Sequence, residues 1–111
     1  MRVVEIERGV SNLVLGDVQI TGFEPARALA GEVLRWMHDL DALIDSATRL
    51  PLAPDAKPRN VLRIMLAGWL RLETPPHAVI ATALPLLAGG PRRLAHGVFS
   101  TLVKRGVKLP A

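Results

Sequence analysis

The stretch from Pro25 to Asp45 constrains the fold of this chain more than any other. Apolar residues recur in it at steps of three and four residues over about twenty positions, the period of an α-helix with one buried face. They are Leu29, Val33, Trp36, Met37, Leu40 and Ile44. Pro25 suits the first helical position, where its missing N–H costs nothing. We therefore predict one long helix at the centre of the core.

A second apolar run predicts another buried helix. It opens at Pro58 after the proline-rich stretch RLPLAPDAKP, and its apolar residues continue to Leu72 on more than one face. This helix should be buried on several sides, so Arg63 and Arg71 within it must reach water or a partner.

Two further helices follow. One is expected from about Pro75 to Ala88, closed by Gly89 and Gly90 as a C-cap. The last runs from about Arg92 to Arg105, with its basic residues at the C-terminal end.

The N-terminal residues show no strand alternation. Val3 to Glu7 predict a short helical element that stops near Gly9, and Ser11 or Asn12 can cap a second short turn. The sequence as a whole predicts a single all-α domain over residues 1–111, a compact bundle of five to six helices.

Composition excludes several classes of protein. The 111 residues contain no cysteine, which rules out disulfides, thiolate zinc sites and Fe–S clusters. Charges at Glu5, Glu7 and Arg8 interrupt the apolar core that a signal peptide needs, and four prolines break the uncharged run between Thr74 and Arg92. We expect a cytoplasmic chain with no membrane partner.

The segment LETPPHAV raises the question of a reactive histidine. Thr74 is a good N-cap and Pro75 suits the first helical position, which places His77 in the third position of a helix. The positive end of a helix disfavours a protonated imidazole, so His77 is interpreted as a structural, hydrogen-bonding group. His38 and His96 lack metal-ligand spacing to it, and no metal site is expected.

The sequence offers no catalytic centre. It lacks a P-loop and a dinucleotide-binding glycine pattern, so no cofactor and no enzyme activity are expected. Asp39, Asp41 and Asp45 could form an acid–base or cation site, but Arg35 and Arg49 flank them at four-residue spacing. Salt-bridged carboxylates on a helix surface are the better interpretation.

The charge balance favours a polyanionic partner. Fourteen Lys and Arg against ten Asp and Glu give a net charge of +4 and a pI near 10.7. Arg92 and Arg93 lie at a predicted helix N-terminus, where backbone N–H groups already attract anions. A scattered basic surface without a specific partner is the alternative, and the few aromatic residues argue against base stacking.

Several motifs, in their order, resemble the NusB-like RNA-binding domain, and most closely the version at the N-terminus of Sun/Fmu (RsmB-type) rRNA cytosine-5 methyltransferases. They are GVSNLVL (9–15), EPARALAGEVLRWMHDLDALID (24–45), VLRIMLAGWLRLETPPHAVIATAL (61–84) and GPRRLAHGVFSTLVKR (90–105). The resemblance implies two packed helical sub-bundles that bind RNA. In those methyltransferases a catalytic domain that uses S-adenosylmethionine follows, and we expect no such domain within these 111 residues.

The resemblance and the charges together imply an accessory domain that positions rRNA for a methyltransferase, chiefly through phosphates. The candidate RNA-binding residues are Arg2, Arg8, Asn12, Arg92, Arg93, Lys104 and Arg105, with Asn12 as a possible cap or sugar contact. The alternative is a protein-interaction module that docks a ribosomal-protein-like or transcription-antitermination partner, or a methyltransferase domain. An exposed apolar patch around Trp36 or Trp69 would favour that alternative.

Overall fold

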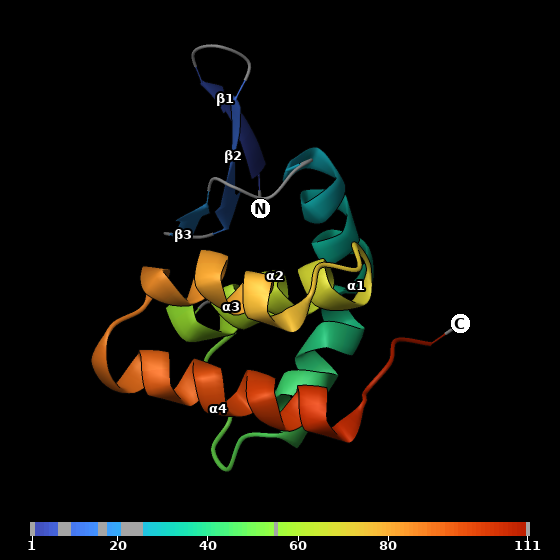
Figure 1. The fold of residues 1–111 in the computed structure, drawn as a ribbon, viewed down its shortest axis with the longest axis vertical. Helices are drawn as coiled ribbons and strands as arrows, with labels where there is room; N and C mark the ends of the chain where they lie inside the picture. The colour runs from blue at the N-terminus through green and yellow to red at the C-terminus, as the bar shows by residue number, and fades with distance from the viewer. Residues whose placement is uncertain (1, 7–9, 16–17, 21–25, 55, 111) are drawn as a thin grey trace.

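The structure is a computed structural model that describes residues 2–6, 10–15, 18–20, 26–54 and 56–110 (Figure 1). Three short strands precede a helical body. The strands are β1 (Arg2–Ile6), β2 (Val10–Leu15) and β3 (Val18–Ile20). The described helices are α1 (Ala26–Ser46), α2 (Lys57–Leu70), α3 (Pro76–Ala83), the 3-10 turn η2 (Leu84–Leu86) and α4 (Gly89–Arg105).

The all-α prediction is confirmed for this body of the chain, with four α-helices among the described residues instead of five to six. Helix α2 lies at its centre and is buried from Arg59 to Gly68. Helices α1, α3 and α4 all pack against it, which confirms the prediction that α2 is covered on several sides. Figure 1 shows α3 and α4 side by side and antiparallel, with α1 crossing one end of both.

The predicted stripe along α1 is the face that packs on α2. Leu29, Val33, Leu40 and Ile44 are fully buried, because steps of three and four residues keep them on one side of the helix. Phe99 and Leu102 of α4 complete the same core.

The prediction of short helices before residue 20 is wrong. Strands β1, β2 and β3 form an antiparallel sheet in sequence order, with Val4 opposite Asn12 and Val14 opposite Gln19. Valine and isoleucine make up much of these strands, and β-branched residues favour extended backbone over helix. The sheet lies against α1 and touches α2 through β3.

Two predicted helix boundaries also change. Helix α3 ends at Ala83, and Gly89 and Gly90 open α4 instead of capping the helix before it. Gly89 has a φ of 59°, in the left-handed region that glycine adopts without strain. The turn into α4 therefore depends on a glycine at this position.

None of the described helices is both long enough and apolar enough to cross a membrane.

Candidate functional site

Helix α4 presents cations at both of its ends. Arg92 and Arg93 lie in its N-terminal part and are exposed, and no side chain caps the helix at Ala88. Lys104 lies in the last turn and is also exposed. The α4 sequence contains no acidic residue, so each of these charges faces solvent on a helix without an internal counter-charge.

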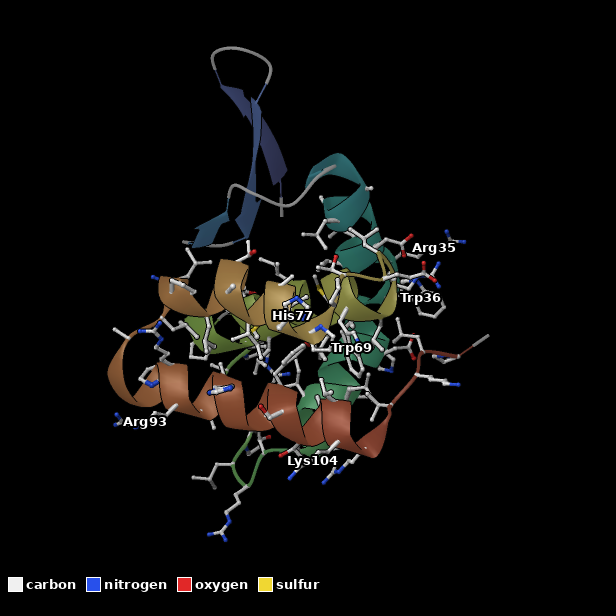
Figure 2. The ribbon with its side chains drawn as sticks, viewed as in Figure 1. Arg35, Trp36, Trp69, His77, Arg93 and Lys104 are labelled. Atoms are coloured by element: carbon white, nitrogen blue, oxygen red, sulfur yellow. The ribbon has the colours of Figure 1, made fainter. Side chains whose placement is uncertain are left out.

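Helical geometry places two of these cations in one line. Arg93 and Lys104 are eleven residues apart, close to three full turns, so they share a face of α4 about 16 Å apart along its axis. Figure 2 shows both side chains on the outer side of α4. A linear polyanion lying along α4 can therefore contact both ends of the helix.

Arg105, another predicted contact, has a structural role as well. Its Nη1 atom donates to the backbone oxygen of Ser46 at 3.3 Å and lies 3.5 Å from the Ser46 Oγ. Ser46 is the last residue of α1, so the Arg105 charge meets the negative end of that helix. Lys108, just beyond α4, is exposed instead.

The distribution of charge along the sequence also distinguishes this surface, and it was not among the sequence predictions. All ten Asp and Glu of the chain lie at or before Glu73, whereas five of the fourteen Lys and Arg follow it. Helices α3 and α4 therefore carry no carboxylate, and the five cations lie on α4 or just beyond it. We call the side of these two helices that faces away from α2 the α3–α4 face.

The two described N-terminal candidates do not join this group. Arg2 lies in β1 and Asn12 in β2, and Figure 1 shows the sheet on the opposite side of the α2–α3 layer from α4. Arg8 lies outside the described residues. The six described members of the predicted set thus divide between the sheet and α4.

Two acidic residues of α1, Asp41 and Asp45, form ion pairs with arginines of α2 and not with neighbours on their own helix. Asp41 accepts from Arg63 at both carboxylate oxygens, at 2.7 and 2.8 Å, and from Arg59 at 3.2 Å. Arg59 also donates to Asp45 at 2.7 Å and to the Leu52 backbone oxygen. The prediction that Arg35 and Arg49 pair with these carboxylates is therefore wrong for Asp41 and Asp45, because α2 supplies arginines where the two helices pack. Asp39, the third predicted carboxylate, forms no ion pair with a described residue.

This cluster is structural. Arg59 and Arg63 are only 4% and 6% exposed, and Arg63 also donates to the Asn60 amide oxygen at 2.8 Å. Burial works to raise the pKa of Asp41, but the hydrogen bonds and charges of Arg63 and Arg59 outweigh it and hold that pKa below its usual value. Burial likewise disfavours the charge of Arg59, while Asp45 and Asp41 raise its pKa. The cluster joins α1, α2 and the loop between them.

Arg71, the residue just after α2 that was also expected to reach water or a partner, contacts α1. It donates from Nε to the Glu32 carboxylate at 2.8 Å, and its guanidinium lies 5.1 Å from the centre of the Trp36 ring. The hydrogen bond from Arg71 is the main cause that lowers the pKa of Glu32, and it outweighs the opposing effect of burial. The Trp36 Nε1 atom is buried without an acceptor at hydrogen-bonding distance among the described residues.

His77 lies at the start of α3, as predicted, but its surroundings differ. The N-cap is Pro75 and not Thr74, which makes His77 the second helical residue, and its side chain is exposed. Within the part of the chain that the structure describes, no group of three or more His, Cys, Asp or Glu residues is placed to hold a metal ion.

An apolar groove lies between α3 and α4. It has a volume of about 250 Å³ and is lined by Pro76, Ile80, Phe99, Ser100, Val103 and Lys104. Trp69 of α2 meets the Phe99 ring edge-on, with the ring centres 5.8 Å apart. Both tryptophans are half-buried, and the hollow apolar surface adjoins Trp69 and not Trp36.

No family model, no curated protein and no solved structure matches the chain. The proposal for its function therefore depends on the geometry of the site and on the sequence.

Proposed function

We propose that this chain is an RNA-binding accessory domain that holds rRNA by its phosphates and positions it for a cytosine-5 methyltransferase. The observation that carries this proposal is the segregation of charge. Every carboxylate of the chain lies at or before Glu73, and the α4 cations that follow are exposed. Phosphate contacts of this kind position a nucleic acid without reading its bases.

The contacts around α4 favour some of the predicted residues over others. Arg92, Arg93 and Lys104 are exposed and form no ion pair with any described residue, so a phosphate would not have to displace a carboxylate. Arg105 is already engaged with the end of α1 and is the weaker candidate. The uncapped N–H groups at the start of α4 add a favourable field for an anion beside Arg92 and Arg93.

The choice of RNA among polyanions depends on the resemblance to the NusB-like domain of rRNA methyltransferases. That resemblance includes GPRRLAHGVFSTLVKR, the stretch that forms nearly all of α4. It also supplies the proposed role, since the catalytic domain in those enzymes acts on the RNA that this domain would hold.

The double substitution Arg92→Glu with Arg93→Glu tests this proposal. We expect it to abolish binding to structured rRNA fragments. Glutamate near a helix N-terminus interacts favourably with the helix dipole, so the variant should stay folded, which circular dichroism can check. Unchanged affinity in the folded variant would refute the proposal.

A charge-matched control is available in α1. Arg35 and Arg93 are both exposed arginines on helices, and Figure 2 shows them at opposite ends of the molecule. Arg35→Glu changes the net charge as much as Arg93→Glu does. If the α3–α4 face is the binding site, the first substitution should weaken RNA binding far less than the second.

A further inference from the structure

The groove between α3 and α4 has an apolar floor and a charged rim. Phe99 is fully buried beneath it, while Pro76, Ile80 and Val103 are half-buried and line its walls. Lys104 is exposed at the edge and forms no ion pair with a described residue. Apolar surface of this kind stays in contact with water unless a partner covers it.

The size and chemistry of the groove exclude most small molecules as its occupant. Its volume of about 250 Å³ lies below the roughly 300–1,000 Å³ of typical ligand pockets, and Ser100 and Lys104 are the only polar residues in its lining. A nucleotide base would need a flat ring to stack on, but Phe99, the one aromatic residue in the lining, is fully buried. The groove does have room for about one or two large apolar side chains of a peptide.

The charge around the groove selects the kind of peptide. None of the six lining residues is acidic, and neither α3 nor α4 carries a carboxylate. Lys104 at the rim and the other exposed cations of α4 favour an acidic partner and disfavour a basic one.

We infer that the groove is a docking site for an acidic peptide segment of a partner protein. One or two apolar side chains of the segment enter between Ile80 and Val103, and a carboxylate of the segment pairs with the Lys104 ammonium. This inference shares Lys104 with the proposed RNA-binding surface, but it can be tested apart from it, because the groove lining includes neither Arg92 nor Arg93.

A selection from a displayed library of random dodecapeptides tests the inference on the whole chain. We expect enriched peptides that combine large apolar residues with Asp or Glu. In a Trp36→Phe background the fluorescence of Trp69, which packs on Phe99, reports their binding. Absence of enrichment, or enrichment of basic peptides, would overturn the inference.

Two variants locate the binding. Ser100→Trp should fill the groove and lower the affinity of the selected peptides at least about tenfold. Lys104→Glu, on an exposed residue that does not threaten folding, should weaken them by a similar factor, whereas Lys108→Glu should have little effect although it changes the net charge equally. Peptides that bind both Ser100→Trp and Lys104→Glu as they bind the natural chain would contradict the proposed site.

RNA binding serves as the distinguishing measurement. Arg93→Glu should weaken the binding of structured rRNA fragments and leave the binding of the peptides nearly unchanged. Ser100→Trp should weaken the binding of the peptides and leave that of the rRNA fragments nearly unchanged. If Ser100→Trp abolishes RNA binding and no peptide is selected, the groove belongs to RNA and the peptide inference is wrong. If peptides bind and RNA does not, the inference stands and the proposed RNA-binding function fails.

Discussion

Asp41 should contribute much more to stability than Asp45, although the two carboxylates lie one turn apart on α1. Asp41 contacts both buried arginines and is 27% exposed, whereas Asp45 contacts Arg59 alone and is 51% exposed. Asp41→Asn removes the charge that compensates Arg63, whose other hydrogen-bond partner is Asn60. Asp45→Asn leaves Arg59 with Asp41 and the Leu52 oxygen.

The expected magnitudes follow from these contacts. Breaking a buried ion pair at one partner costs about 3–5 kcal/mol, and the partial exposure of Asp41 places Asp41→Asn near 3 kcal/mol. Loss of a half-exposed pair costs about 0.5 kcal/mol, which we expect for Asp45→Asn. At a denaturant slope of about 1.5 kcal/mol/M, the urea midpoint should fall by about 2 M in the first variant and by about 0.3 M in the second.

Urea unfolding followed by far-UV circular dichroism measures both midpoints under the same conditions. The two variants lose the same charge, so each is the matched control of the other. Equal losses, or a cost below about 1 kcal/mol for Asp41→Asn, would refute the assignment of the cluster as the joint between α1 and α2.

Three further predictions concern the same helices. The pKa of Asp41 in the folded chain lies below its ordinary value of 3.8, so the Asp41 carboxylate stabilises the fold fully above that pH and less as the pH falls through the folded-state pKa. Urea titrations at acid pH should therefore show a smaller loss of unfolding free energy for Asp41→Asn than at neutral pH. A loss that does not change with pH would contradict this. Arg71→Ala should cost about 1 kcal/mol, and NMR titration should find the pKa of Glu32 raised toward 4.5; an unchanged pKa would contradict the ion pair. Glu73 lies in the turn after α2 with a φ of 58°, which strains a residue other than glycine. Glu73→Gly should therefore stabilise the chain by about 0.5–1 kcal/mol in the same urea assay, and a loss of stability would count against the strain.

The helical core could be predicted because its signal is local. The spacing of Leu29, Val33 and Leu40 fixes the face of α1 that packs inward, and the apolar residues of α2 cover too much of its circumference for an exposed helix. The sheet was missed because the search for strands relied on alternation, although the valines and isoleucines of β1 and β2 were visible.

The polar contacts could not be predicted from local spacing. Asp41 lies 18 and 22 residues from the two arginines that it binds, and only the packing of α1 on α2 brings them together. The four-residue spacing of neighbours on one helix predicted Arg35 and Arg49 as the partners instead. Likewise, glycines after a helix usually close it, and here the 3-10 turn at Leu84–Leu86 intervenes, so Gly89 opens the next helix.

The basic surface was predicted in part. Arg92, Arg93 and Lys104 were identified from their positions at helix ends, but Arg2 and Asn12 fall on the sheet, away from α4. The absence of acidic residues after Glu73 could have been found in the sequence, because it needs no structure. Only the structure shows that the residues after Glu73 form two neighbouring helices, α3 and α4, with an apolar groove between them.

The salt dependence of RNA affinity tests the central proposal most directly, with structured rRNA fragments titrated against the natural chain, Arg93→Glu and Arg35→Glu. If about four cations of the α4 region contact phosphates, the logarithm of the association constant should fall with the logarithm of salt concentration with a slope near −3. Arg93→Glu should reduce that slope by about one, and Arg35→Glu should leave it unchanged. A slope near zero, or equal effects of the two substitutions, would contradict an RNA-binding surface on α3 and α4.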